Sequence, residues 1–300
     1  MEIAWGIFLA LIGAACGSFV GAMTWRMHYN NEIGTKKSKT KSKKNTTRKP
    51  EKLSWVNGRS QCEHCGHQLA WYDLLPIVSW LWLKGKCRYC GKKIGWTAIA
   101  LEIGVGAAFV VSFLFWPATS QAGPVGQPVQ AVGFLLWLIT VVLMAALLVY
   151  DARWRLLLDK LLWPLIGVVF VWNVISFVVC ATHGWSVALG YLGDIALALI
   201  PVFGLYLVLY LISRGRWVGF GDVKFGIVVA LILADWKMAT LVLIGANVLG
   251  TLLVLPSLVM KKLNVNSQIA FGPFLILATF LTFLFGRPLI EWATKYLFFV

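Results

Sequence analysis

The chain of 300 residues is 59% hydrophobic and only 13% charged, and its mean hydropathy is +0.78. A water-soluble protein of this length needs a more polar surface, so the composition excludes an ordinary soluble enzyme and predicts a polytopic membrane protein. The formal net charge of +15 does not indicate nucleic-acid binding, because most of the basic residues gather on one side of the predicted membrane segments.

Apolar segments of spanning length recur along the chain and predict an all-α polytopic membrane protein of about eight transmembrane helices. The first segment carries Glu2 in place of a basic n-region and is too long for a signal peptide, so we expect a retained helix. The sixth segment is short. The predicted spans are Ile3–Met23, Thr97–Trp116, Ala131–Tyr150, Leu161–Ala181, Ala188–Ile212, Val223–Ala234, Ala239–Met260 and Ile269–Ile290.

The distribution of basic residues predicts the orientation. Thr24–Gly95 holds 16 of the 27 Lys and Arg residues, whereas the connections Pro117–Gln130 and Thr182–Gly190 hold none. Because Lys and Arg collect in cytoplasmic loops, the large loop is predicted to be cytoplasmic and the amino terminus outside.

Three parts follow from this pattern. We expect a first transmembrane helix over residues 1–23, a small cytoplasmic loop domain over 24–95, and a seven-helix membrane domain over 96–300. Within the loop, the Lys-rich stretch Gly34–Pro50 has no apolar face and is predicted to be a solvated linker. A weak attraction to anionic lipid headgroups is the alternative for this stretch.

Two Cys-x-x-Cys pairs in the loop, "CEHC" and "CRYC", are separated by 21 residues, and a glycine follows each pair. Two such knuckles can close a tetrahedral thiolate shell around Zn²⁺. A closed shell leaves no open position, so we predict a structural and not a hydrolytic metal. Disulfides, redox thiols or an empty site are the alternatives, and the expected reducing side disfavours disulfides. The predicted ligands are Cys62, Cys65, Cys87 and Cys90.

Carboxylates at a membrane edge are costly and therefore informative. Asp151 lies at the end of the predicted third span, and Asp222, 71 residues later, lies at the start of the sixth. The predicted orientation brings both to the cytoplasmic face. Two neighbouring carboxylates share a proton, so the charged one can deprotonate a water while the neutral one polarises a peptide carbonyl, as in aspartyl proteases. We expect Gly219 and Gly221 to permit positive φ and a close approach of an extended substrate strand.

Each of these acids also has a structural interpretation as an alternative to a catalytic role. A single Asp at a helix end is more often a cap or the partner of a basic residue, and Asp159 fits that alternative. Asp194 and Asp235 are expected near the outer face, where they cannot join the pair. Structural hydrogen bonding is the expectation for Asp73 and Glu102, which flank the cysteine loop.

Taken in order, these motifs resemble the type IV prepilin peptidases, a family of GxGD-type intramembrane aspartyl proteases. The resemblance covers nearly the whole chain. Carried over residue by residue, it implies that Asp151 and Asp222 are catalytic and that Asp159, Gly219, Gly221 and Lys224 support them. The blocks that carry it are "GSFVGAMTWR" (Gly17–Arg26), the two cysteine pairs, "WYDLLPIVSWLWLKGKCRYCGKKI" (Trp71–Ile94), the two acids Asp151 and Asp159, "GFGDVK" (Gly219–Lys224) and "FGPFL" (Phe271–Leu275).

The resemblance also implies an activity. Members of the family remove the short basic leader from prepilin-like precursors at the cytoplasmic face, and those with the four-cysteine loop methylate the new amino terminus from S-adenosylmethionine. We therefore expect a multi-pass enzyme of the bacterial inner membrane, with structural Zn²⁺ and S-adenosylmethionine as cofactors. Its expected partners are prepilin or pseudopilin precursors and the lipid bilayer, with no nucleic acid. No motif identifies the S-adenosylmethionine site, which we expect within Leu69–Gly95.

The chain departs from the family pattern without losing a catalytic carboxylate or a cysteine, which suggests a divergent member. A peptidase without methyltransferase activity, or a zinc-stabilised membrane scaffold for pilus or secretion assembly, are the alternatives. A transporter is disfavoured because both aspartates lie at one face and no inverted repeat is evident. The departures are Gly21 for the usual Asn, Leu158 and Ala270 for the usual Pro, and Trp217 for the usual Gly.

Overall fold

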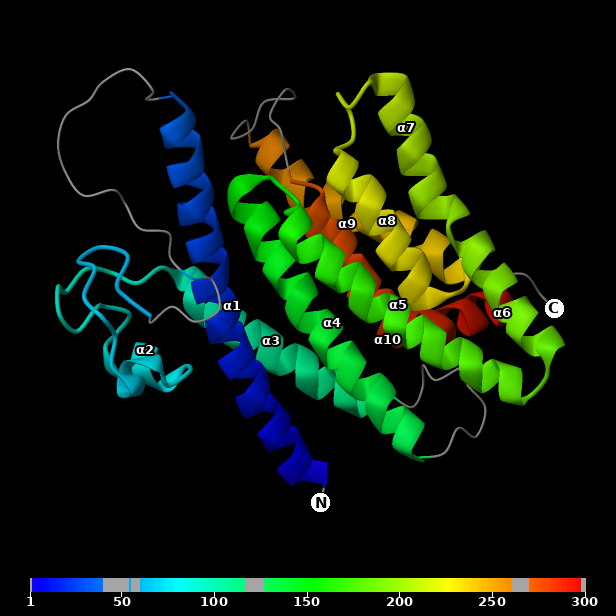
Figure 1. Ribbon diagram of the computed structural model, residues 1–300, viewed down its shortest axis with the longest axis horizontal. Coiled ribbons are helices and arrows are strands. Elements are labelled where there is room, and N and C mark those ends of the chain that lie inside the picture. The colour runs from blue at the N-terminus through cyan, green and yellow to red at the C-terminus, as the bar shows by residue number, and fades with distance from the viewer. Residues whose placement is uncertain (1, 40–53, 55–59, 117–126, 261–269, 298–300) are drawn as a thin grey trace. The chain divides into compact units, whose positions relative to one another are not determined.

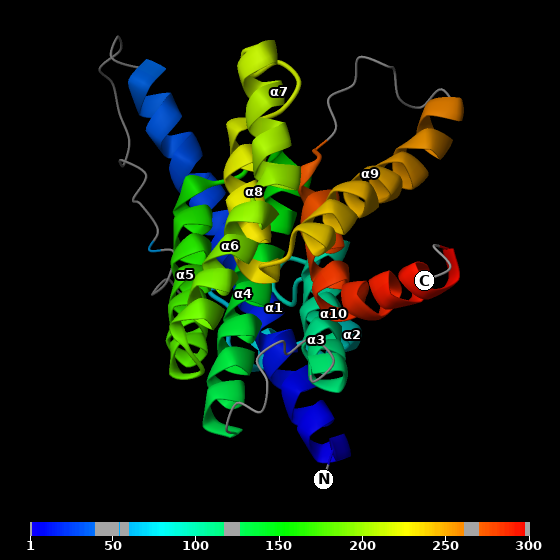
Figure 2. The ribbon, with the colours of Figure 1, turned by 90° about the vertical axis from the view of Figure 1, so that its right-hand side faces the viewer.

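The computed structural model describes residues 2–39, 54, 60–116, 127–260 and 270–297, and every extended regular element within them is a helix (Figure 1, Figure 2). Seven helices in this part of the chain are long and apolar enough to cross a membrane. They confirm the predicted all-α polytopic fold, with the cysteine loop between the first and second spans. The chain divides into two compact units, residues 1–110 and 111–300.

The first unit joins two membrane helices to the cysteine loop. Small residues allow its two long helices to pack closely, since a Cβ added at Gly13 would lie 2.8 Å from the Cα of Gly106. The first helix extends beyond Met23, where the apolar run ends, and the polar residues that continue it include no proline. The elements are α1 (Glu2–Lys39), η1 (Trp71–Leu74), α2 (Val78–Trp82) and α3 (Trp96–Phe115), whose last residues belong to the second unit.

The second unit is a helical bundle. In it α5 packs against both α4 and α8, while α10 packs against α4 and α9 (Figure 1). The elements are α4 (Gln127–Trp154), α5 (Asp159–Thr182), α6 (Trp185–Ala198), η3 (Ile200–Gly204), α7 (Leu205–Ser213), α8 (Phe220–Leu233), α9 (Trp236–Val259) and α10 (Gly272–Leu297).

The predicted fifth span is a continuous apolar run that contains a π-helical turn, η3. Pro201 lies in this turn and lacks the N–H that a regular helix needs, which accounts for the irregularity. The turn packs directly on α8, because a Cβ added at Gly226 would lie 2.8 Å from the backbone of Phe203.

The helix α8 corresponds to the predicted short sixth segment. It has 14 residues, and at a rise of about 1.5 Å per residue its length is roughly 21 Å, less than the ~30 Å hydrocarbon core. It therefore cannot cross a bilayer alone. Most of its side chains after Asp222 are buried by neighbouring helices, among them Phe225, Val228 and Val229.

Three polar contacts join helices inside the second unit. The amide of Asn173 on α5 donates to the Leu231 carbonyl of α8 at 2.9 Å, and the Tyr191 hydroxyl of α6 donates to Asn173 at 2.8 Å. On the far side of α4, the Trp137 indole N–H donates to Ser112 at 2.9 Å. Because lipid offers no replacement donors or acceptors, such bonds fix how these helices meet.

Candidate functional site

The two predicted aspartates lie at the ends of different helices. Asp151 is in the last turn of α4 and is only 5% exposed, and Asp222 is in the first turn of α8. Each carboxylate accepts a backbone N–H at the start of a helix. Asp151 accepts that of Gly272, the first residue of α10, and Asp222 accepts that of Gly219, the N-cap residue of α8.

The connection between α4 and α5 brings these two helix starts together. A Cβ added at Gly221 would lie 2.6 Å from the Cβ of Leu157. One added at Gly272 would lie 2.5 Å from a carboxylate oxygen of Asp151 and 3.5 Å from Leu157. Leu157 therefore contacts the starts of both α8 and α10. Because Asp151 contacts Gly272 and Asp222 follows Gly221, the structure places the two predicted aspartates on either side of Leu157.

The two glycines of the GxGD stretch differ from the sequence expectation. Gly219 has φ −72° and ψ 146°, an ordinary extended conformation, and Gly221 is helical. Neither has positive φ. Gly221 is needed for a different reason, because the side chain of Leu157 occupies the place that a Cβ would take. That place is therefore not open to a substrate strand.

Asp159 and Lys224 form an ion pair beside the aspartates. Lys224 Nζ donates to Asp159 Oδ1 at 2.7 Å, and the ammonium also lies 5.0 Å from the ring centroid of Phe220. Asp159 begins α5 and Lys224 lies two residues beyond Asp222 in α8. The pair therefore ties the start of α5 to the turn of α8 that carries Asp222.

The two outer acids do not join this site. Asp235 caps α9 by accepting the N–H of Lys237 at 2.7 Å. Asp194 lines a cavity of about 360 Å³ between helices of the second unit, together with Trp172 and Arg287. The residues that line this cavity include neither Asp151 nor Asp222.

Tyr206 is a site residue that sequence reasoning missed. It is 5% exposed, and its buried hydroxyl has no hydrogen-bond partner among the described residues. Its ring packs edge-on against Phe271 at 6.0 Å, directly before Gly272, and its hydroxyl interacts electrostatically with Asp222. Nothing near Tyr206 in the sequence marks it, because it comes to the aspartates through the packing of η3 on α8. Gly272 lies in the motif "FGPFL", but nothing in the sequence indicates that its amide would bind an aspartate.

The four cysteines of the loop form a second candidate site, on two knuckles of the same geometry. In each, the amide of the glycine after the pair donates to the carbonyl of the first cysteine at 2.9 Å. Both glycines, Gly66 and Gly91, have positive φ, of 68° and 69°. A backbone bridge closes each knuckle, Gln61 with Gln68 and Lys86 with Lys93.

The knuckles bring all four sulfur atoms within 4.8 Å of one another. The sulfurs of Cys62 and Cys90 are 3.9 Å apart, which matches the edge of about 3.8 Å of a tetrahedron with Zn–S bonds of about 2.3 Å, and all four cysteines are free. Burial acts to raise the pKa of the Cys62 thiol, but the amides of Cys65 and His64 and neighbouring thiols outweigh it and lower the pKa to about 7. This group can hold a metal ion such as zinc.

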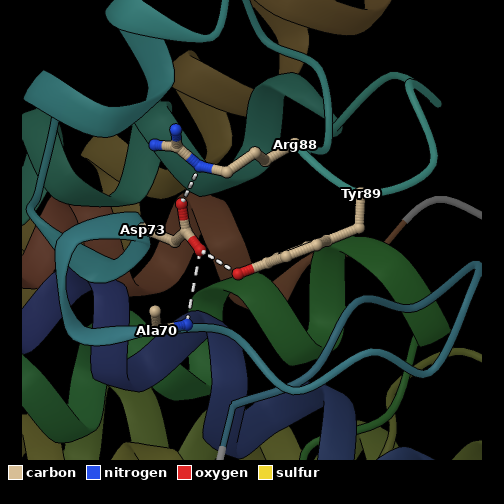
Figure 3. Close-up of polar contacts among 4 residues, drawn as sticks. All are labelled: Ala70, Asp73, Arg88 and Tyr89. Carbon is tan, nitrogen blue, oxygen red and sulfur yellow. Dashed lines mark hydrogen bonds and ion pairs between the residues drawn. The ribbon is translucent and has the colours of Figure 1, made fainter.

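Asp73 joins the segment between the knuckles to the second knuckle. Its carboxylate accepts Arg88 Nε at 2.8 Å, the Tyr89 hydroxyl at 3.1 Å and the Ala70 amide at 3.3 Å (Figure 3). Burial acts to raise the pKa of Asp73, but these hydrogen bonds outweigh it and hold the pKa below its ordinary value. The expectation of a structural role for Asp73 is thus confirmed.

Glu102, the other acid flanking the loop, is buried in α3 and accepts the Ile77 amide at 2.6 Å. This hydrogen bond agrees with the structural role expected from the sequence. It ties the residue before α2 to the interior of a membrane helix.

Comparisons with known proteins agree with the arrangement of motifs. Residues 11–116 match the family described as Bacterial Peptidase A24 N-terminal domain. The chain is 30% identical over 237 residues to a prepilin leader peptidase/N-methyltransferase of Dichelobacter nodosus, covering 77% of this chain and 72% of the relative. A protein of the same name from Pseudomonas putida is 26% identical over 295 residues, covering 95% and 93% of the two chains.

A further relative of that name, from Stutzerimonas stutzeri, is 27% identical over 232 residues, covering 76% of this chain and 72% of the relative. No solved structure matches the chain. The identity and coverage of the relatives, the matched amino-terminal domain and the four-cysteine loop all agree: the chain is an enzyme of the type IV prepilin peptidase family.

Proposed function

We propose that this protein is a membrane-embedded aspartyl endopeptidase that removes the leader from type IV prepilin-like precursors. The observation that carries the proposal is the placement of Asp151 beside the start of α10 and of Asp222 in the first turn of α8, two helix starts that Leu157 joins. A buried acid, Asp151, near a half-buried one, Asp222, suits general acid and base catalysis on a peptide bond. The names of the relatives supply the substrate class, a prepilin with its leader.

In the proposed reaction one carboxylate is ionised and the other holds the shared proton. The ionised carboxylate takes a proton from a water molecule, whose oxygen attacks the scissile carbonyl, while the protonated carboxyl donates a hydrogen bond to the carbonyl oxygen. Collapse of the tetrahedral intermediate breaks the C–N bond. The leaving nitrogen takes the proton that the first carboxylate removed from the water molecule. The Asp159–Lys224 pair holds the turn of α8 that carries Asp222 during these steps.

The site is proposed to lie at the cytoplasmic face of the bacterial inner membrane, with the amino terminus outside. The support is the charge distribution, since the loop Thr24–Gly95 holds 16 of the 27 basic residues and two of the opposite connections hold none. A precursor whose basic leader stays in the cytoplasm would present its scissile bond at this face, where water has access.

Replacing either Asp151 or Asp222 by Asn is expected to lower the rate of leader cleavage by at least about 10⁴-fold, since each residue has its own role in the proton transfers. Cleavage of a purified prepilin precursor by the detergent-purified variants, followed on gels, measures this. Asp194→Asn is the matched control, because this acid lies on a membrane helix but lines a separate cavity. Cleavage at the wild-type rate by either aspartate variant, Asp151→Asn or Asp222→Asn, would contradict the mechanism.

We also propose that the Tyr206 hydroxyl donates a hydrogen bond to the substrate carbonyl oxygen as negative charge develops on it. A buried hydroxyl without a partner costs free energy, and its position beside Asp222 offers a reason for keeping it. Phe271 packs against the ring and holds it next to the start of α10.

Tyr206→Phe is expected to lower kcat by about 10 to 100-fold with little change in KM, because the lost bond forms mainly in the transition state. Steady-state kinetics with a prepilin peptide in lipid nanodiscs measures this. Tyr210→Phe, one turn further along α7, removes a hydroxyl from the same helix and serves as the control. If kcat of Tyr206→Phe equals that of the wild type while Asp222→Asn is inactive, the proposed role of Tyr206 is wrong. The proposed roles of Asp151 and Asp222 would then still hold.

The four-cysteine group is proposed to hold a structural Zn²⁺. Its sulfur geometry supports this, and the ion would supply the cross-link that a short loop without a large core lacks. The thiolates of Cys62, Cys65, Cys87 and Cys90 would be its ligands.

Purified wild-type protein is expected to contain about one zinc per chain, and Cys87→Ser to lose it. Metal analysis by mass spectrometry gives the content, and limited trypsin digestion at Lys84 and Lys86 reports unfolding of the loop. Cys180→Ser, on α5 and outside the cluster, is expected to keep its zinc. A wild-type content near zero would refute the site.

Methylation of the new amino terminus from S-adenosylmethionine is proposed as the second activity. The relatives' names support it, together with the four-cysteine loop. No residue is assigned to the methyl donor. Asp73, the acid nearest to the exposed Trp71 and Tyr72, already accepts three hydrogen bonds and does not offer a free carboxylate to a ribose.

Incubation of the purified protein with a precursor and radiolabelled S-adenosylmethionine separates the proposed functions. We expect a cleaved product whose amino terminus carries the label. A cleaved product without label would indicate a peptidase that lacks methyltransferase activity. If the precursor is neither cleaved nor labelled, the result would favour a membrane scaffold for pilus assembly. Asp222→Asn is the control, since no new amino terminus forms in it.

A further inference from the structure

The short helix α2, between the two cysteine knuckles, turns an apolar face outward. Val78, Leu81 and Trp82 are 57%, 60% and 80% exposed. Their spacing puts all three on one side of the helix. The preceding turn η1 adds Trp71, which is 76% exposed. Such a patch would be unfavourable if it faced only water, so its surroundings must be apolar on one side.

Two contacts hold α2 beside the first turns of a membrane helix. The Ile77 amide, at the N-cap of α2, donates to Glu102 of α3 at 2.6 Å. The ring of Trp80 lies 5.2 Å from that of Trp96, the first residue of α3. Glu102 lies about 9 Å along the helix axis from Trp96. Because α3 meets the criteria of a membrane span from Trp96 onward, α2 lies at the level where that span enters the bilayer.

The backbone before α2 is strained in a way that these contacts explain. Ile77 has φ 63°, which is unfavourable for a β-branched residue. Its hydrogen bond to the buried carboxylate of Glu102 fixes this conformation, which sets the direction in which α2 leaves the loop. The helix is thus held in place against α3 and is not a loosely attached segment.

The other end of the patch is held by the hydrogen bonds of Asp73. They tie η1 to Arg88 and Tyr89 of the second knuckle (Figure 3). The guanidinium of Arg88 also lies 5.0 Å from the ring centroid of Tyr72. Trp71 is therefore presented on a fixed support. Basic residues follow α2 directly, with Lys84 and Lys86 exposed at its carboxyl end.

We propose that η1 and α2 form an interfacial anchor that lies in the surface of the bilayer. The patch of Trp71, Val78, Leu81 and Trp82 enters the boundary between headgroups and acyl chains. Lys84 and Lys86 face lipid phosphates. Tryptophan prefers this depth because its ring is apolar and its N–H is polar, and basic side chains are attracted to anionic headgroups. The cysteine knuckles then stand on the membrane surface.

The anchor is tested in the full-length protein in nanodiscs of phosphatidylethanolamine and phosphatidylglycerol. An added cysteine, Leu81→Cys, is labelled with the fluorophore NBD in a Cys16→Ser/Cys180→Ser background that keeps the four cysteines of the loop, and labelling of the background protein alone gives the blank. We expect blue-shifted emission and strong quenching by lipids that carry a spin label near the headgroup end of the acyl chain. Lys92→Cys, on the exposed side of the second knuckle, is the matched control and should be quenched several-fold less.

Equal, water-like emission and weak quenching at both positions would overturn the proposal and would favour a protein partner for the patch. Zinc content is measured on each labelled sample, so that an unfolded loop is not mistaken for an exposed one. Lys84→Glu/Lys86→Glu, in the Leu81→Cys background, should weaken the quenching if anionic lipid contributes. The outcome does not depend on the proposed peptidase activity.

Discussion

The lack of hydrogen-bond partners in hydrocarbon is the constraint that explains most of this structure. A polar group placed among lipid chains must be satisfied by the protein itself. Asp151 and Asp222 meet this requirement with the free amides at the starts of α10 and α8. Asn173 meets it by binding the Leu231 carbonyl of α8. The same constraint makes the buried hydroxyl of Tyr206, which has no hydrogen-bond partner among the described residues, the most informative exception.

Much of the fold could be predicted from the sequence, because spanning segments are defined by composition and length. The boundaries could not. The apolar run of the first span ends at Met23, but α1 continues to Lys39, since hydrogen bonding within a helix does not require apolar side chains. Similarly, the apolar run of the fifth span correctly predicts one span, but it does not predict the π-helical turn at Pro201 within that span. Such a turn depends on packing against α8, which hydropathy does not describe.

The site was predictable in part. Orientation alone put Asp151 and Asp222 at one face, and the structure brings them together. The sequence does not predict which residues hold the two aspartates in place, because these residues are distant along the chain. Leu157 fills the space left by Gly221, and Gly272 provides the amide for Asp151. The predicted positive φ of the glycines was wrong because a glycine can be required for close packing as well as for a turn.

The loop illustrates how two demands are met within a short segment. Two knuckles of matching geometry carry the four cysteines of the metal site. The residues between the knuckles contribute no cysteine to it. These residues cannot form a core of their own, because they are too few. A segment in that position must bury its apolar side chains against something else. The hydrogen bond of Ile77 to Glu102 and the ring contact of Trp80 with Trp96 hold it beside the first turns of α3. The metal ion and the bilayer together would then replace the core that the loop lacks.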